Sequence, residues 1–179
     1  MVQTARPSAD STDGGWVNES EGTTLYTSID EVTADGATTH IYSTDDGSND
    51  TCIVDLASID APGSGNVYIK YTALGEDNMG MGAPGIEIRL LEGGATRGAA
   101  HTDTNVASSW GTEVTSSAID VSSVSNWGNL ELKITMTTNS GSGMDYLKVT
   151  QAYLETPDAA ASSTATPMAL NTYQQMRND

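Results

Sequence analysis

The feature that most constrains the fold is a strict alternation of apolar and polar residues over positions 130–137. The apolar set is Leu130, Leu132, Ile134 and Met136, and the polar set is Glu131, Lys133, Thr135 and Thr137. Successive side chains of an extended chain point to opposite faces, so a period of two puts one set on each face. The stretch predicts a strand with one buried face and one wet face, which requires a sheet that covers a core.

Further short segments have the composition of strands and are separated by turn signals. The stronger candidates are 51–56, 67–73, 86–90 and 144–155, and the weaker ones are 23–30, 40–43, 99–104 and 110–119. Asp35-Gly36, Gly93-Gly94 and the Gly/Ser run 140–143 are typical of turns. Because several connections are long, the pattern predicts an all-β antiparallel β-sandwich of jelly-roll or Greek-key type.

A chain of 179 residues has the length of one ordinary domain, and we expect a single sandwich with two arms. Residues 1–15 are polar and lead to Trp16, so they predict an N-terminal arm that becomes fixed where Trp16 docks. The sandwich is expected over 16–157. Residues 158–179 are rich in Ala, Ser and Thr and predict a C-terminal arm, which carries an apolar cluster of Met168, Leu170, Tyr173 and Met176.

The charge excludes some classes of partner. There are 24 acidic and seven basic residues, which gives a net charge of -17. Affinity for nucleic acid comes mostly from neutralising phosphates, so we expect no binding to nucleic acid or to anionic membrane surfaces. The sequence also has no apolar run of membrane-spanning length and no secretory leader, which predicts a soluble protein made in the cytoplasm.

No residue set predicts catalysis. Cys52 lies in an apolar run and is expected to be a small buried residue. His40 and His101 are far apart in sequence, and the carboxylates near Cys52 would disfavour its thiolate. The many Asp and Glu residues define no particular glycosidase pair. We therefore expect a protein that is not an enzyme.

Two short motifs are weighed and set aside. Gly80–Gly85 has the spelling of a dinucleotide loop but leads into a strand, where that motif needs a helix. Asp45–Asp50 has the oxygen-rich composition of a calcium loop without the glutamate of an EF-hand, and a solvated turn is the favoured interpretation. The sequence therefore predicts no cofactor and no metal site.

The three tryptophans leave two interpretations open. Sandwiches can bind sugars by stacking Trp or Tyr faces against them, and Trp16, Trp110 and Trp127 are the candidate platforms, with Trp110 and Trp127 the possible glycan contacts. Each also lies next to glycine at the boundary of a predicted element, where a Trp that caps the core is the commoner case.

Several short motifs resemble those of small virion proteins of tailed bacteriophages. They are Arg6-Pro-Ser-Ala-Asp-Ser-Thr-Asp-Gly-Gly-Trp16, Thr24-Leu-Tyr26, Ile29-Asp-Glu31, the stretch 122–130 and Ala152-Tyr-Leu-Glu-Thr-Pro157. The resemblance covers residues 6–157 and implies a jelly-roll sandwich like that of carbohydrate-binding modules.

That resemblance implies a head decoration or cement protein on the capsid exterior. Its partner would be the major capsid protein, with this chain forming a homo-oligomer such as a trimer on the capsid lattice. The arms would make the contacts, through Arg6, Pro7 and Trp16 at one end and Met168, Leu170, Tyr173 and Met176 at the other. The alternative is a glycan-binding module of a phage tail or head fibre that attaches to host polysaccharide.

Overall fold

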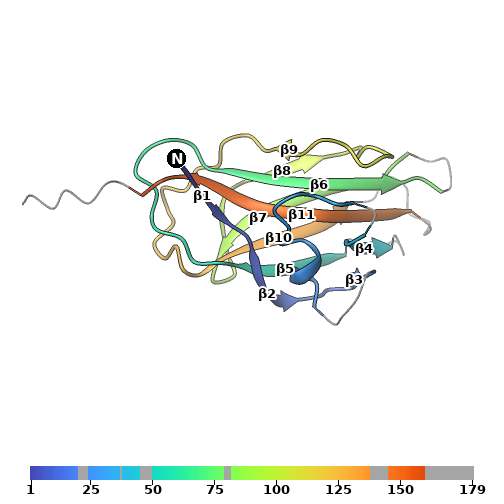
Figure 1. Ribbon diagram of the computed structural model, residues 1–179, viewed down its shortest axis with the longest axis horizontal. Coiled ribbons are helices and arrows are strands. Elements are labelled where there is room, and N and C mark those ends of the chain that lie inside the picture. The colour runs from blue at the N-terminus through green and yellow to red at the C-terminus, as the bar shows by residue number, and fades with distance from the viewer. Residues whose placement is uncertain (20–23, 37, 45–49, 79–81, 138–144, 160–179) are drawn as a thin grey trace, which may run out of the picture.

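The computed structural model describes residues 1–19, 24–36, 38–44, 50–78, 82–137 and 145–159, which form an antiparallel β-sandwich (Figure 1). The β11 sheet has the order β3 (Val17–Asn18), β4 (Ile41–Thr44), β11 (Tyr146–Pro157), β6 (Tyr68–Glu76), β9 (Val114–Thr115), with β1 (Val2–Ala5) also paired to β11. The β10 sheet has the order β2 (Pro7–Thr12), β5 (Thr51–Leu56), β10 (Leu130–Thr137), β7 (Gly85–Glu92), β8 (Ala95–Asp103). The chain passes repeatedly from one sheet to the other, as in jelly-roll and Greek-key wiring.

The core lies between the two sheets and follows the predicted alternation. The four apolar residues of β10 are at most 1% exposed, whereas the intervening residues are partly exposed. Ile69 and Tyr71 of β6 and Leu147 and Val149 of β11 are equally buried and face β10 from the other sheet. The prediction of a sandwich built around residues 130–137 is confirmed.

The N-terminal residues differ from the predicted arm. β1 pairs with the end of β11, and β2 pairs with β5 in the opposite sheet, so residues 2–12 join the edges of both sheets. Pro7 is buried, and Trp16 is 3% exposed and belongs to the core. The prediction of an arm over residues 1–15 is thus wrong for residues 2–12, because pairing of the backbone does not require apolar side chains.

Residues 23–30 form no strand where they are described. A 3-10 turn spans Tyr26–Ser28, and the buried residues Leu25 and Ile29 lie on either side of it. The Asp10 carboxylate accepts hydrogen bonds of 2.7 Å from the backbone N–H groups of Leu25 and Tyr26, which satisfies donors that such a turn leaves free. This turn is the helical element of the described residues, and none of them forms a helix long and apolar enough to cross a membrane.

The predicted strand 110–119 is mostly irregular. Only Val114–Thr115 is a strand, although Ser116 and Ile119 still donate backbone hydrogen bonds to Ile69 and Val67 of the β6 edge. The other predicted strands are confirmed with shifted ends, such as β8, which begins at Ala95 immediately after the Gly93-Gly94 turn.

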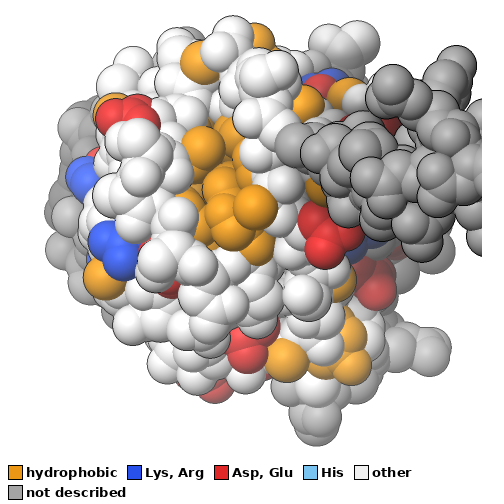
Figure 2. Space-filling model, turned by 90° about the vertical axis from the view of Figure 1, so that its left-hand side faces the viewer, with side chains coloured by type: hydrophobic (Ala, Val, Ile, Leu, Met, Phe, Trp, Pro, Cys, Tyr) orange, Lys and Arg blue, Asp and Glu red, His pale blue; other side chains and the backbone are white. Residues whose placement is uncertain are grey.

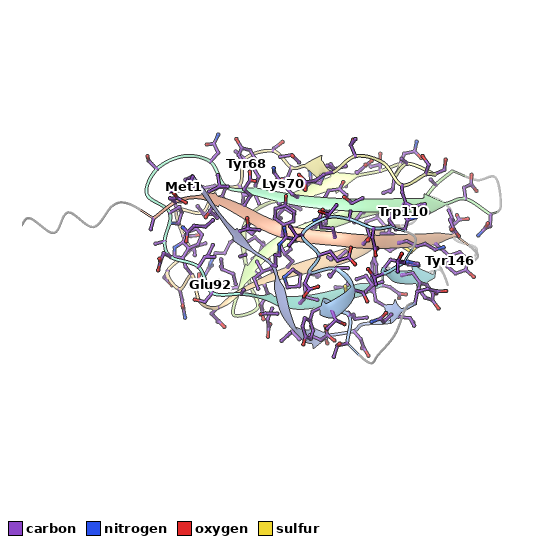
Figure 3. The ribbon with its side chains drawn as sticks, viewed as in Figure 1. Met1, Tyr68, Lys70, Glu92, Trp110 and Tyr146 are labelled. Atoms are coloured by element: carbon purple, nitrogen blue, oxygen red, sulfur yellow. The ribbon has the colours of Figure 1, made fainter. Side chains whose placement is uncertain are left out.

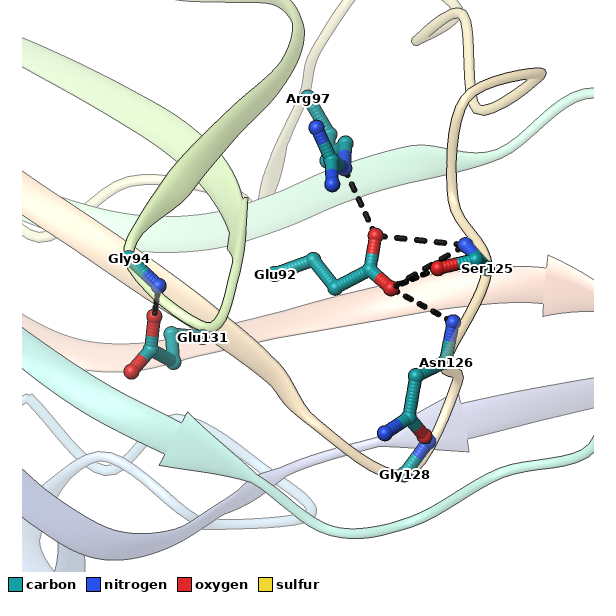
Figure 4. A network of polar contacts seen from close by, with 7 residues as sticks. All are labelled: Glu92, Gly94, Arg97, Ser125, Asn126, Gly128 and Glu131. Atoms are coloured by element: carbon teal, nitrogen blue, oxygen red, sulfur yellow. Dashed lines mark hydrogen bonds and ion pairs between the residues drawn. The ribbon is translucent and has the colours of Figure 1, made fainter.

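A buried carboxylate fixes the turn that precedes β10 (Figure 4). Glu92 of β7 is 7% exposed and accepts hydrogen bonds from Ser125 Oγ at 2.7 Å, Arg97 Nε at 2.7 Å and the Asn126 backbone N–H at 2.6 Å. These donors, with Ser125 and Arg97 foremost, lower the pKa of Glu92 to about 2. The turn is thereby held against the sandwich, where Trp127 packs on the core.

The placement of β10 predicts a large effect of shortening an inward side chain. Leu132→Ala should lower the free energy of unfolding by about 2–5 kcal/mol, because it leaves a cavity in the core. Lys133→Ala, one residue further on the outward face, should change it by less than about 0.5 kcal/mol. Urea denaturation measures both, and equal stability of the two variants would contradict this placement.

The Glu92 network predicts a pH-dependent stability. The carboxyl has a pKa of about 2 in the folded protein against an ordinary value of 4.5, so its contribution is complete above about pH 4.5 and disappears as the pH falls towards 2. Glu92→Gln should therefore lower the melting temperature most at neutral pH and least near pH 2.

The matched control is Asp60→Asn, because Asp60 is exposed and bonds to Gln3 through its backbone only. At neutral pH the melting temperature should fall less for this control than for Glu92→Gln. A difference for Glu92→Gln that stays constant from pH 2 to 7 would mean that its charge does not stabilise the turn.

Candidate functional site

The outer face of the β11 sheet carries the polar and aromatic side chains of its two longest strands. Ile69 and Tyr71 of β6 and Leu147 and Val149 of β11 point into the core, so the residues alternating with them face outward. The outward set is Tyr68, Lys70, Thr72, Leu74 and Glu76 on β6, and Tyr146, Lys148, Gln151, Tyr153 and Glu155 on β11. Figure 3 shows Tyr68 and Lys70 towards one end of this face and Trp110 and Tyr146 towards the other.

At the end of the face near Lys70, the side chains contact one another and leave little surface for a ligand. Lys70 Nζ lies 3.1 Å from a Glu155 carboxylate oxygen and 3.4 Å from a Glu113 oxygen, and the Tyr153 hydroxyl donates a 2.6 Å hydrogen bond to Glu113. The Arg6 guanidinium carbon lies 4.6 Å from the centre of the Tyr153 ring. Tyr153 is 8% exposed, and burial together with the Glu113 hydrogen bond raises its pKa to about 12. Its ring therefore offers no free face to a ligand.

Trp110 contacts the loop that precedes β4. A Cβ at Gly36 would come within 2.8 Å of the indole, and Gly36 has a positive φ of 52°, so this close approach requires glycine. Thr150 accepts a hydrogen bond from the Gly36 N–H at 3.1 Å and donates one to the Thr39 carbonyl at 2.8 Å. The loop and the partly buried Trp110 are thus fixed over the irregularity in β11.

His40 lies near two aromatic rings, those of Trp110 and of Tyr42 in β4. Its ring centre lies 5.8 Å from that of Trp110 and 6.5 Å from that of Tyr42. The imidazole is 7% exposed, and neither ring nitrogen has a hydrogen-bond partner among the described residues. Burial, and next the nearby charge of Lys148, lowers the pKa of His40 and keeps the ring neutral.

The open part of the face is a recess between Tyr42 of β4 and Tyr146 of β11. The two ring centres are 6.1 Å apart and the planes are tilted by 54°. The cavity between them has a volume of about 260 Å³ and is also lined by Glu19, Glu76 and Lys148. Lys148 Nζ lies 2.6 Å from Glu76 Oε1, and both side chains remain partly exposed. We call these five residues the Tyr42–Tyr146 recess.

The recess combines two partly exposed aromatic rings with charged hydrogen-bonding groups. The rings offer apolar contact area, Lys148 donates, and the carboxylates of Glu19 and Glu76 accept. A ligand that is apolar on its faces and rich in hydroxyl groups at its edges fits this combination.

Two larger cavities lack this combination. One, of about 390 Å³, lies between β8 and residues 116–119 and is lined by His101 and small side chains. The other, of about 480 Å³, is lined by Asp77, Asn105 and small residues of the neighbouring loops. Neither lining contains a Tyr or Trp ring, and His101 is the single aromatic side chain among them, so neither offers a pair of aromatic rings to a ligand.

Trp110 and Trp127, which were predicted as possible glycan contacts, lie in different surroundings. Trp110 lies close to His40, whereas Trp127 packs on the core, as do Ile59, Val121 and Val124. Figure 2 shows hydrophobic side chains grouped in the middle of the end of the sandwich that faces the viewer.

The residues expected to contact a capsid either make contacts inside the domain or lie outside the described residues. The guanidinium of Arg6 donates to the backbone oxygens of Asp30 and Glu31, and Pro7 and Trp16 are buried. These three side chains are therefore used inside the domain. Met168, Leu170, Tyr173 and Met176 lie outside the described residues, as do most of Asp45–Asp50 and part of Gly80–Gly85.

The residues weighed for catalysis and for metal binding have structural surroundings. Cys52 is fully buried, and burial raises the pKa of its thiol far above the usual range. His101 Nε2 lies 3.1 Å from the Tyr71 hydroxyl. Among the residues that the structure describes, no three His, Cys, Asp or Glu side chains are arranged to hold a metal ion.

Sequence reasoning missed Tyr42 and Tyr146 as site residues. Both lie in strands with alternating patterns, and an aromatic residue is common at any strand position. The available signal was that each occupies the outward phase of its strand, where an aromatic side chain would be left without a core to pack against.

No protein-family model matches the chain, and no curated protein matches it. Among solved structures, the chain is similar to the xylan-binding module CBM15, with 12% identity, a TM-score of 0.45 and coverage of 89% of this chain and 99% of that one. It is also similar to the C-terminal CBM6 of LamC, a marine laminarinase from Zobellia galactanivorans, with 12% identity, a TM-score of 0.44 and coverage of 87% and 99%.

A third similarity is to the arabinose-bound α-L-arabinofuranosidase MgGH51, with 9% identity, a TM-score of 0.48 and coverage of 79% of this chain. The chain spans 23% of the length of that enzyme. Identities and TM-scores of this size assign neither a family nor a ligand to the chain.

Proposed function

We propose that this chain is a glycan-binding module and that it binds its ligand at the Tyr42–Tyr146 recess. The observation that carries the proposal is the pair of partly exposed rings, 6.1 Å apart, around a cavity of about 260 Å³ that also contains Glu19, Glu76 and Lys148. A sugar ring has C–H groups on its faces and hydroxyl groups around its edge, so stacking and hydrogen bonding can act on it together.

The position of the recess supports the same proposal. Tyr146, Lys148, Tyr42 and Glu76 come from three adjacent strands of a sheet whose other face is buried in the core. Strand backbones hold the side chains in fixed relative positions, so little conformational freedom is lost when a ligand binds. His40 lies near both Tyr42 and Trp110, so Trp110 is a neighbour of this set.

The shape of the recess favours a single glycan chain over a flat surface. A crystalline polysaccharide surface needs coplanar rings, whereas the Tyr42 and Tyr146 planes are tilted by 54°. The volume of about 260 Å³ is also below the roughly 300–1,000 Å³ of pockets that enclose a drug-sized ligand. The ligand would therefore place a short stretch of one chain against the exposed parts of the two rings and beside the charged side chains of the recess.

The resemblance to virion proteins of tailed phages supports a place for this module on a phage particle. A tail or head fibre that carries it would attach to host polysaccharide, with many weak sites acting together. The decoration role stays a prediction from that resemblance, since the C-terminal residues on which it depends lie outside the described part of the chain.

The proposal predicts that removal of one ring abolishes most of the affinity. Tyr146→Ala should weaken binding to a recognised glycan by about tenfold or more, because the stacking surface on β11 is lost. A glycan array identifies the ligand, and titration calorimetry then measures the dissociation constants.

The matched control is Tyr68→Ala, which removes a ring from the same face at the opposite end of β6. Both variants should melt within a few degrees of the parent, which separates lost binding from lost folding. Equal affinities of the parent and Tyr146→Ala for every glycan bound would exclude the recess as the site.

A further inference from the structure

We infer that the Tyr42–Tyr146 recess selects uncharged glycans and rejects anionic ones such as polyuronates. This inference rests on the proposed function and adds the chemical class of its ligand. It is argued from the positive charges on this face, because a carboxylated sugar that leaves water needs a cation as its new partner.

The cations on the outer face of the β11 sheet already have partners. The chain contains seven Lys and Arg residues, and in the described part three of them, Arg6, Lys70 and Lys148, lie on this face. Arg6 donates to the backbone oxygens of Asp30 and Glu31 and covers the Tyr153 ring. Lys70 lies between the carboxylates of Glu113 and Glu155. Neither has a charge available for a ligand in the recess.

Lys148 is the cation that lines the recess itself, and its charge is neutralised there. Its ammonium group lies 2.6 Å from Glu76, and Glu19 adds a second carboxylate to the same lining. With one positive and two negative groups, the lining has a net charge of one negative unit. The neighbouring His40 adds no positive charge, since it is buried and both ring nitrogens lack a described partner that would favour its protonated form.

The segments that adjoin the recess in sequence bring no cation. Residues 20–23 follow Glu19, residues 45–49 follow β4, and residues 138–144 precede the strand that carries Tyr146. Together they contain Glu21, Asp45 and Asp46 and no Lys or Arg. By composition these three segments add three negative charges and no positive one.

Neutral and anionic glycans would interact differently with the charged side chains of the recess. Hydroxyl groups of a neutral sugar can donate to Glu19 and Glu76 and accept from Lys148 without disturbing the ion pair. A uronate would have to separate Lys148 from Glu76 or approach Glu19 unpaired, and like charges placed together disfavour a complex. The recess thus favours the neutral ligand by rejecting the charged one.

The experiment compares neutral and uronate oligosaccharides of matched length by titration calorimetry at low ionic strength. The neutral probes are cello-, xylo- and manno-oligosaccharides, and the anionic probes are oligogalacturonates and alginate oligomers. We expect at least about tenfold weaker binding of the anionic probes, with a smaller difference in high salt because exposed charges are then screened. Tyr146→Ala is measured against both sets.

A charge variant tests the cause. Glu76→Gln leaves the Lys148 ammonium without its carboxylate partner, so affinity for uronates should rise at least several-fold. Glu113→Gln, which changes a carboxylate at the Lys70 end of the same face, should leave uronate affinity unchanged. If Glu76→Gln is unstable, Glu19→Gln serves the same purpose, since it removes the second negative group of the lining.

The outcomes separate the two proposals. Binding of uronates at least as strong as that of neutral glycans, and lost in Tyr146→Ala, would overturn the selection of neutral glycans and leave the glycan site standing. The absence of Tyr146-dependent binding to either set would overturn the glycan site and the selectivity with it. Preference for neutral glycans that Glu76→Gln reduces supports both.

Discussion

Backbone pairing along both edges of β11 is the interaction on which the rest of the structure depends. One edge pairs with β6 from Tyr146 to Glu155, and the other pairs first with β4 and then with β1. Between these two partners, the Ala152 N–H donates to the Ile29 carbonyl at 3.2 Å, so the loop before β4 fills the remaining gap. The strand is therefore satisfied on both sides by different parts of the chain, as buried backbone groups require.

The same strand determines where a site can form. Leu147, Val149 and Leu154 are fully buried, so the residues alternating with them must face outward. The register shift between Val149 and Gln151 interrupts that alternation and ends the pairing with β4. At this point the Gly36 N–H donates to Thr150 Oγ1 and Gly36 lies against the Trp110 indole, so the loop before β4 is fixed over the β11 sheet.

Much of the sandwich could be predicted from sequence because its central strands bury one face each. In residues 130–137 that burial leaves an alternation that no other local structure explains. The sequences of β1 and β2 show no such alternation, since these are edge strands held by backbone hydrogen bonds and their side chains are mostly polar. The 3-10 turn at Tyr26–Ser28 depends on Asp10, a residue distant in sequence, so no local pattern could reveal it.

The site was harder to predict for a related reason. Tyr42 and Tyr146 become neighbours only through the pairing of β4 with β11, which a single sequence does not specify. Trp110 was recognisable by its residue type, but the reason for its position is Gly36, in a turn far away in the chain. A sequence pattern predicts which residues of one strand face outward. Predicting a binding face also requires knowing which strands lie next to one another in the sheet.

The acidity of the chain connects stability with selectivity. A net charge of -17 opposes compaction through mutual repulsion, and each ion pair on the β11 sheet reduces that repulsion locally. Exposed pairs of this kind contribute little stability individually. Their larger consequence is that Lys70 and Lys148 have their charge compensated within the domain. Pairing that relieves repulsion in the folded state thus also deprives an anionic ligand of a counter-charge, while hydroxyl groups can still share the same carboxylates and ammonium.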